Sequence, residues 1–257
     1  RGLGDVYKRQ YVNGFPLVVL EFKSAIKEDA TLEDAFRQIT IRYARDIPGL
    51  FHYNAFVVIS DGVNSKIGTL FSDYANFYAW NRSELDGRSA KGLDSIDTLM
   101  DGVFRRDRFL SILRDFIYFP DQGKEFKVVC RYPQFFGATR ILENVKKHLK
   151  PQGDGKGGTY FGTTGCGKSF TMLFLTRMLM RSRELRNPTI VLVTDRNNLD
   201  HQLNDLFVNS KNFINDAQVF CMGSRAELRT RLTGHTSGGV FLTTIQKFSE
   251  GDTVLSD

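Results

Sequence analysis

The chain has 257 residues, a formal net charge of +6, 41% hydrophobic and 25% charged residues. This composition is that of a globular protein with one large domain or two ordinary ones. Its basic balance favours acidic partners such as nucleic acid. No apolar run approaches the ~20 residues that span a bilayer, so we expect no membrane as a partner.

The cysteines and histidines give no sign of a disulfide framework or a metal site. Cys130, Cys166 and Cys221 are far apart and form no C-x-x-C pair. We therefore expect reduced thiols and a cytoplasmic location. The histidines show no metal-ligand spacing, so we assign no metal site to them.

Both ends of the sequence suggest a piece of a longer protein. "DVYKRQ", within residues 1–10, matches one translated frame of a transposon end used in sequencing libraries. We interpret residues 1–10 as a non-native segment and leave them out of the fold prediction, the alternative being an ordinary polar N-terminus. The far end follows a strand-like run without a closing helix. We therefore expect an internal fragment.

Residues 11–119 predict a small mixed α/β domain with a linker helix. Apolar runs predict buried strands, and apolar residues at helical spacing predict helices. The predicted elements are a strand at 15–24 behind the Asn13-Gly14 turn, a helix at 29–47 capped by Thr31, strands at 54–60 and 67–72, a polar connection at 81–100 and a helix at 103–119. Pro120 marks the expected domain boundary.

Residues 120–257 predict a second α/β domain. Short apolar runs alternate with helical segments, which is typical of a parallel sheet with crossover helices. The expected elements are helices at 132–150 and 168–181, a Gly-rich loop at 151–158, and strands at 159–162, 189–195, 217–222 and 239–244.

The stretch from Gly162 to Ser169 fits the phosphate-loop pattern G-x-x-x-x-G-K-S/T at every fixed position. Glycines let backbone N–H groups turn toward phosphates, and the following helix N-terminus adds partial positive charge. Lys168 is expected to reach the outer phosphates, and Ser169 to ligate Mg²⁺. The predicted nucleotide-binding residues are Gly162, Thr163, Thr164, Gly165, Cys166, Gly167, Lys168 and Ser169.

The loop alone does not identify the class of protein, because kinases, GTPases, transporters and DNA motors all carry it. "VLVTDRNNLDHQL" (191–203) and "GVFLTTIQKF" (239–248) resemble, in order and spacing, the early motifs of superfamily 2 DNA translocases. That resemblance implies DNA-backbone contacts from Arg196, Thr243, Thr244 and Gln246. It also implies that Gln134 reads adenine. The alternatives are a polar loop and an ordinary surface glutamine.

In "VLEFKSA", Glu21 and Lys23 lie on one face of a strand, because side chains alternate with period two. A Glu-x-Lys pair at a strand end is the second half of the PD-(D/E)xK nuclease signature. There the carboxylate ligates Mg²⁺, and the ammonium positions or activates water and stabilises charge on the phosphate. The alternative is a solvated pair at a strand end.

Together "NGFPLVVLEFKS", "AFRQITIRYARDIPGLFHYNAFVVISDG", the phosphate loop, "TDRNNLDHQL" and "TTIQKF" resemble the motor (R) subunit of type I restriction endonucleases, from about residue 11 onward. The resemblance implies a PD-(D/E)xK nuclease-like domain followed by a RecA-like motor lobe that translocates and cuts duplex DNA. It implies ATP and Mg²⁺ as cofactors, with methyltransferase and specificity subunits as partners. Catalytic roles then fall to Glu21, Lys23, Gln38 and Tyr43, although the Gln38-to-Tyr43 spacing is one residue longer than usual.

Two departures from that family stand out. The metal-binding Asp is expected near position 7, where the sequence has Tyr7, and Asp5 is out of that register. The Asp-Glu box that supports ATP hydrolysis is expected after the "TTIQKF" run, and the given sequence stops at Asp257 before such a box. We therefore expect this fragment to bind nucleotide weakly and neither to cut DNA nor to turn over ATP. Two alternatives stay open: another superfamily 2 helicase–nuclease fusion, and a DNA-binding scaffold with a degenerate nuclease.

Overall fold

The computed structural model describes residues 6–12, 14–23, 31–84, 92, 94–122, 126–195, 197–215 and 218–247. The chain divides into two compact units, residues 1–118 with 124–136 (unit 1) and residues 119–123 with 137–257 (unit 2). Parallel and antiparallel sheets occur with helices, which confirms a mixed α/β protein. Within these described ranges, no helix has the length and apolar character needed to cross a bilayer.

Unit 1 is built on one sheet with the strand order β1-β2-β3-β4-β5. Its strands are β1 (Val6–Val12), β2 (Phe15–Phe22), β3 (Phe56–Ser60), β4 (Ser65–Gly68) and β5 (Tyr78–Ala79). β2 pairs in parallel with β3, and the other neighbours are antiparallel. Gly14, at φ +85°, turns the chain between β1 and β2, as the predicted hairpin turn requires. The partner in that turn, Asn13, lies outside the described residues.

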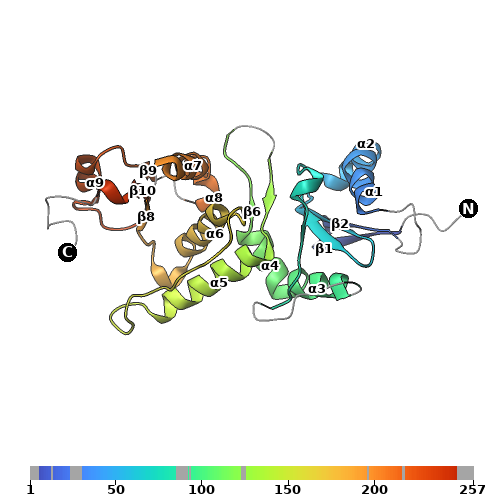
Figure 1. Cartoon of the computed structure of the whole chain (residues 1–257), viewed down its shortest axis with the longest axis horizontal. Coiled ribbons are helices and arrows are strands. Elements are labelled where there is room, and N and C mark those ends of the chain that lie inside the picture. The colour runs from blue at the N-terminus through green and yellow to red at the C-terminus, as the bar shows by residue number, and fades with distance from the viewer. Residues whose placement is uncertain are drawn as a thin grey trace, which may run out of the picture. The chain divides into compact units, whose positions relative to one another are not determined.

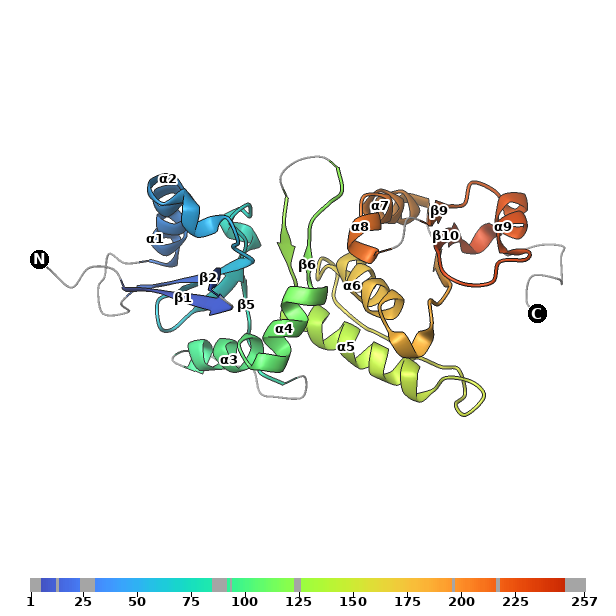
Figure 2. The ribbon, with the colours of Figure 1, turned by 180° about the vertical axis from the view of Figure 1, so that it is seen from behind.

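Helices cover both faces of this sheet, as Figures 1 and 2 show. The unit contains α1 (Leu32–Arg37), the π-helical segment η1 (Gln38–Tyr43), α2 (Ala44–Asp46), the 3₁₀ turns η2 (Pro48–Phe51) and η3 (Tyr74–Asn76), α3 (Asp94–Val103), α4 (Arg106–Asp115) and the short pair β6 (Ile117–Tyr118) and β7 (Val128–Val129). Val19 of β2 packs with Ala35 and Ile39 on one face. Phe56 of β3 packs against Phe109 on the other.

The predicted helix after residue 29 is confirmed where it is described, and its start has a clear local cause. Thr31 is the N-cap, and its hydroxyl accepts a hydrogen bond from the N–H of Asp34 at 3.2 Å. The Asp34 carboxylate accepts from the backbone N–H of Thr31 at 2.9 Å, which completes a capping box. The π-helical segment inside this helix was not predicted.

Three boundaries in unit 1 differ from the sequence prediction. Residues 94–103 form α3 instead of a polar connection, because Ile96, Leu99 and Val103 repeat at helical spacing and the last two are buried. The helix expected at 103–119 is shortened to α4, and its end joins the β6–β7 pair. The strand expected at 67–72 is β4, which ends at Gly68, where any Cβ would collide with the Phe77 ring.

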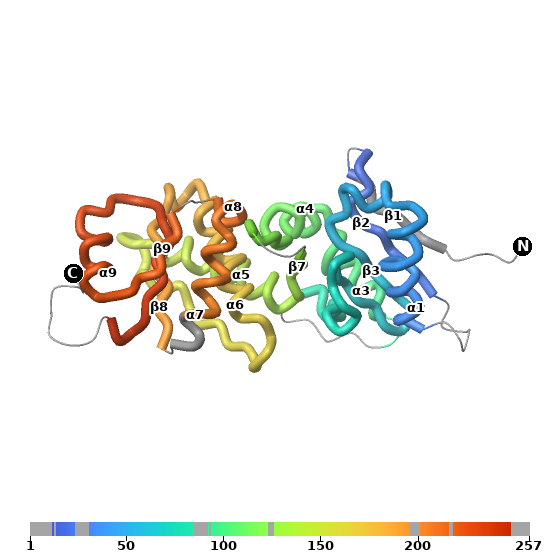
Figure 3. The backbone as a smooth tube through the Cα atoms, turned by 90° about the horizontal axis from the view of Figure 1, so that it is seen from above, coloured from blue at the N-terminus to red at the C-terminus, as the bar shows by residue number. Residues whose placement is uncertain are grey.

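Unit 2 contains the predicted parallel sheet, with the strand order β8-β10-β9. Its elements are the later part of α5 (Tyr132–Lys147), α6 (Lys168–Met180), η4 (Arg183–Leu185), β8 (Ile190–Thr194), α7 (Asn197–Val208), α8 (Lys211–Ile214), β9 (Val219–Cys221), α9 (Arg225–Leu232), β10 (Val240–Thr244) and η5 (Ile245–Lys247). α7 and α9 lie on opposite sides of this sheet (Figure 3). Phe241 of β10 packs against Leu228 of α9.

The strand expected at 159–162 is absent from the described part of unit 2, where these residues pair with no strand. Tyr160 instead packs on α5. Its ring lies 2.6 Å from the position that a Cβ at Gly137 of α5 would take. The phosphate-loop stretch therefore follows an irregular segment whose Tyr160 lies against α5. α6 begins at Lys168, as predicted.

Candidate functional site

Glu21 and Lys23 lie on the face of β2 that α1 covers, as their spacing predicts. The Glu21 side chain is 0% exposed and that of Lys23 is 10% exposed, with Nζ 3.2 Å from Glu21 Oε1. A buried carboxylate is stabilised by a close cation, which compensates part of its lost hydration. The pair is therefore a buried ion pair and not a solvated pair at a strand end.

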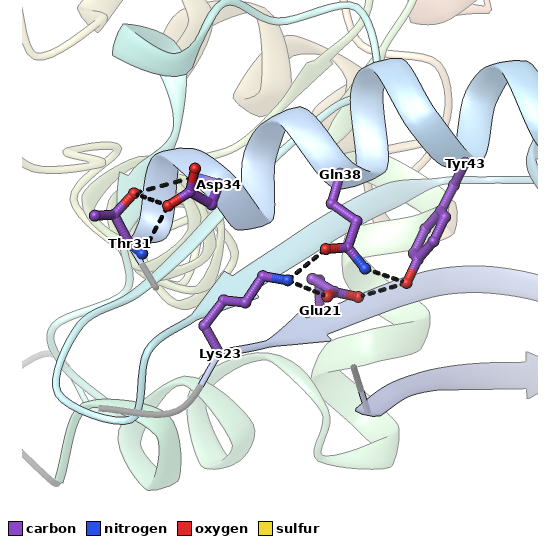
Figure 4. Close-up of polar contacts among 6 residues, drawn as sticks. All are labelled: Glu21, Lys23, Thr31, Asp34, Gln38 and Tyr43. Carbon is purple, nitrogen blue, oxygen red and sulfur yellow. Dashed lines mark hydrogen bonds and ion pairs between the residues drawn. The ribbon is translucent and has the colours of Figure 1, made fainter. Parts of the chain in front are cut away.

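Two side chains from the π-helical segment close this pair into a ring (Figure 4). Lys23 Nζ donates a hydrogen bond to Gln38 Oε1. Gln38 Nε2 donates to the Tyr43 hydroxyl at 2.6 Å, and that hydroxyl donates to Glu21 Oε2 at 3.2 Å. We call these four residues the polar ring. The structure thus brings together all four residues that the sequence assigned to the catalytic group.

The helix that carries Gln38 and Tyr43 is fixed at its N-terminus by the capping box. The hydrogen bond from the Thr31 hydroxyl to Asp34, followed by the one from the Thr31 backbone, lowers the pKa of the Asp34 carboxyl below its usual 3.8. A negative charge in the first turn is favourable there because of the partial positive charge at a helix N-terminus. This arrangement anchors the helix at the edge of the site.

The ring does not make up a complete metal site. Glu21 is its single carboxylate, and in the described ranges no cluster of three or more His, Cys, Asp or Glu side chains could hold a metal ion. The backbone register places residue 7 of β1 directly opposite Glu21. Directly opposed residues of an antiparallel pair have Cβ atoms about 5 Å apart. Position 7, where the sequence predicts the metal-binding Asp, thus lies opposite Glu21, and Tyr7 stands there; Asp5 lies outside the described residues.

The phosphate loop is shaped mainly by its backbone. Gly165 and Gly167 have φ values of +78° and +81°, in the region that favours glycine. A Cβ at Gly162 would lie 2.7 Å from the sulfur of Cys166, which makes no disulfide and fills space there. The binding of a phosphate by these residues and the start of α6 stays a prediction.

The polar side chains of the loop lie at its open side. Lys168 is exposed, and its Nζ donates to the backbone carbonyls of Gly162 at 2.8 Å and Thr163 at 2.9 Å. Ser169 is half-buried in the first turn of α6, and Thr164 is exposed. The lysine is thus held by its own loop.

Gln134 has a structural partner that sequence reasoning missed. Its Oε1 accepts a hydrogen bond from the N–H of Arg131 at 2.8 Å, and the residue is only 2% exposed. This is the glutamine half of a capping box at the start of α5. A glutamine three residues past the N-cap is the sequence pattern that could have predicted this contact. Gln134 belongs to unit 1, whereas the phosphate loop belongs to unit 2. Its role in adenine reading stays a prediction.

The residues predicted to contact DNA lie at or after the ends of two neighbouring parallel strands, β10 and β8. Gln246 Nε2 donates to the carbonyl of Asp195 at 3.0 Å, which links the ends of β10 and β8. Thr243 and Thr244 are buried in β10, at 0% and 3% exposure. Arg196 lies outside the described residues. The structure therefore brings the two chain segments together, while their contact with DNA stays a prediction.

Comparison with known proteins gives two family matches. Residues 133–257 match the SWI2/SNF2 ATPase family. Residues 10–76 match the N terminus of the type I restriction enzyme R protein. The first match covers the phosphate loop and the parallel sheet, and the second covers all four residues of the polar ring.

Curated relatives extend over almost the whole chain. The endonuclease subunit of the type I restriction enzyme HindI from Haemophilus influenzae is 37% identical over 93% of this chain and 23% of its own length. A putative type I endonuclease subunit, MjaIXP, from Methanocaldococcus jannaschii is 32% identical over 93% of this chain and 24% of its own length. The chain thus spans about a quarter of these relatives.

Proposed function

The chain is related over 93% of its length to endonuclease subunits of type I restriction enzymes, and from this premise we propose that it is part of an ATP-driven subunit that translocates and cuts DNA. Unit 1 is the PD-(D/E)xK nuclease-like part, and unit 2 begins a RecA-like motor lobe. The observation that carries the proposal is the partly buried ring of Glu21, Lys23, Gln38 and Tyr43, in which Glu21 is fully buried. The natural partners are then duplex DNA and the methyltransferase and specificity subunits, in the cytoplasm.

In unit 1, the proposed role of Lys23 is to present a positive charge to a DNA phosphate beside Glu21. A fixed ammonium in a water-poor site stabilises the negative charge that develops during phosphodiester cleavage. Gln38 and Tyr43 are positioning residues, because they hold the ammonium and the carboxylate in one orientation. Glu21 would be one ligand of a Mg²⁺ ion, but the described residues do not complete its ligand set, so we derive no step through the metal.

In unit 2, the proposed ligand is ATP with Mg²⁺. The loop glycines would offer backbone N–H groups to the phosphates, Lys168 the charge for the outer phosphates, and Ser169 a hydroxyl for the metal. Bound nucleotide supplies the free energy of phosphoanhydride hydrolysis. Lys168 must leave the carbonyls of Gly162 and Thr163 to reach a phosphate. The match to an ATPase family supports this role.

The nuclease proposal is tested by supplying the missing carboxylate. In the intact subunit built on this sequence, with residues 1–10 kept as given, Tyr7→Asp should give Mg²⁺-dependent nicking of plasmid DNA, because position 7 lies opposite Glu21. Tyr7→Asn is the matched control without a charge. Adding Lys23→Ala to the Asp variant should abolish the nicking. Nicking by the Asn control at the same rate, or its persistence without Lys23, would contradict the proposal.

The same register favours a second candidate function. With Tyr7 opposite Glu21, unit 1 would be a degenerate nuclease, and the protein a nucleotide-dependent DNA-binding scaffold. Under that reading, intact subunit carrying Tyr7→Asp binds DNA but never nicks it. Measuring DNA binding and nicking on the same preparation separates the two functions.

The chain itself is proposed to bind nucleotide without turning it over. DNA-stimulated ATP hydrolysis measured on the purified chain should stay at background. Sustained hydrolysis that Lys168→Ala abolishes would show this part of the proposal to be wrong.

A further inference from the structure

The polar ring depends on an irregular turn of helix. Gln38 and Tyr43 are five residues apart, yet their side chains meet at 2.6 Å. In an α-helix, residues five apart point about 140° away from each other around the axis. In η1 the N–H of Ala44 bonds to the carbonyl of Ile39, five residues back. This wider π-turn brings Gln38 and Tyr43 onto one face.

A regular α-helix would place the wrong residue on Glu21. At a spacing of four, the neighbour of Gln38 would be Arg42, whose side chain is exposed in this structure. A guanidinium there would lie beside the Lys23 ammonium, and Glu21 would lose the Tyr43 hydroxyl. The π-turn therefore decides that a phenol, and not a second cation, completes the ring.

Sequence gives the π-turn a local cause. Ile39, Thr40 and Ile41 are three β-branched residues in a row, and such residues are poor helix formers. The Thr40 hydroxyl donates to the carbonyl of Phe36 at 2.8 Å. A Thr side chain that bonds the carbonyl four residues back competes with the regular helical hydrogen bond and bends the helix. Within this segment Ile39 is fully buried, while Ile41 is 60% exposed.

We propose that Thr40 is a positioning residue of the site: its hydroxyl, by bonding the Phe36 carbonyl, holds the π-turn that sets Tyr43 on Glu21. The role of Thr40 in DNA cleavage rests on the proposed nuclease function, whereas its role in holding the π-turn does not. Thr40 itself touches none of the four ring residues through a described hydrogen bond. Its effect on the ring is transmitted through the backbone.

The first test compares Thr40→Val with Thr40→Ser in the 257-residue chain. The valine variant keeps the β-branch and loses the hydroxyl, and the serine variant keeps the hydroxyl. Two-dimensional NMR spectra report the Gln38 side-chain amide and the Tyr43 ring. Thr40→Val should shift both signals, and Thr40→Ser should leave them at their original positions. Unchanged signals in the valine variant, or equal shifts in both variants, would overturn the proposal.

The second test deletes one residue of the π-turn. Deleting Ile41 puts the Gln and Tyr side chains four apart, so a plain α-helix would align them. The ring signals should then persist, and Thr40→Val should have no further effect on them. A valine effect as large as in the full-length chain would assign Thr40 a merely structural role and contradict the proposal. If the deletion variant fails to fold, the valine–serine comparison still decides.

Activity is measured separately, so that the two proposals can fail independently. The intact Tyr7→Asp subunit is assayed for nicking with and without Thr40→Val. Signal shifts without any nicking by Tyr7→Asp alone would sink the nuclease function and keep the π-turn. Nicking by Tyr7→Asp, together with ring signals that Thr40→Val leaves unshifted, would keep the nuclease function and overturn the role of Thr40.

Discussion

In unit 1 the polar ring is partly buried and closed by side chains, whereas in unit 2 the phosphate loop is exposed or half-buried and shaped mainly by its backbone. The lysines show the difference. Lys23 is 10% exposed and held between Glu21 and Gln38, while Lys168 is exposed and bonds the carbonyls of its own loop. A cation inside a closed ring is part of the fold's stability. An exposed cation on a loop contributes little to stability, and for Lys168 we propose the role of binding a ligand.

The largest effect is expected from Lys23→Met. The change removes the ammonium and leaves the fully buried carboxylate of Glu21 without its cation. Breaking a buried ion pair in this way costs about 3 kcal/mol or more. Arg37→Met is the matched control, because its pair with Glu33 is 64% and 52% exposed and should contribute less than ~1 kcal/mol. Urea unfolding of unit 1 measures both, and equal losses would mean that the ring is not a stabilising unit.

Lys168→Ala should separate binding from stability. Charged hydrogen bonds to phosphate are worth ~1.5–3 kcal/mol, so nucleotide affinity should fall roughly 10- to 100-fold. The melting temperature should barely change, because the lysine is exposed and bonds only solvent-side carbonyls. Lys156→Ala, in the exposed Gly-rich loop, is the control. Calorimetric titration with ADP gives the affinities; a large loss of stability without loss of binding would reverse the assignment.

The comparison also separates what sequence can and cannot predict. β2, the Thr31 cap and the parallel strands of unit 2 follow from short-range periodicity and capping, so they were predictable. The loop conformation at Gly165 and Gly167 was predictable, because glycines at positive φ leave a fixed pattern, while its binding of phosphate stays a prediction. Backbone-shaped features are thus readable from local sequence.

Features set by tertiary partners were harder to predict. The polar ring is one of them: the Tyr43 hydroxyl reaches Glu21, which lies 22 residues away in the sequence, and the π-turn that permits this contact was not predicted. Residues 159–162 carry a strand-like pattern, but Tyr160 lies on α5 and no described strand pairs with them. Such outcomes are decided by contacts between segments that are distant in sequence.

A second buried lysine of unit 1 gives a test by pH. Lys127 is 7% exposed, donates to the Asn54 carbonyl, and burial lowers its pKa from 10.5 to about 8. Between those values the unfolded chain binds more protons than the folded chain, so the stability of unit 1 should rise with pH. Below about pH 8 both states are protonated and this contribution is constant.

The measurement is urea unfolding at about pH 7 and about pH 10, with Lys127→Met as the control that removes the titrating group. The rise with pH should be larger in the original chain than in the variant. Burial also raises the pKa of the Cys130 thiol, which acts in the opposite direction in both proteins and cancels in their difference. A stability that falls with pH relative to the variant would contradict the burial of Lys127 as a cation.

The smallest effects are expected from two helix caps that differ in what their helices carry. The Thr31 hydroxyl caps the helix that leads into the polar ring, and the Ser224 hydroxyl caps α9 by accepting from the N–H of Glu227 at 3.2 Å. Each change to Ala should cost about 1 kcal/mol. Thr31→Ala should also shift the Gln38 and Tyr43 signals, because a closed ring needs its helix in register. Ser224→Ala should leave ADP affinity unchanged, since no residue of the phosphate loop lies on α9. The two variants should thus lose similar stability, but only Thr31→Ala should disturb its functional site. A loss of ADP affinity in Ser224→Ala would show that the phosphate loop too depends on its helical surroundings.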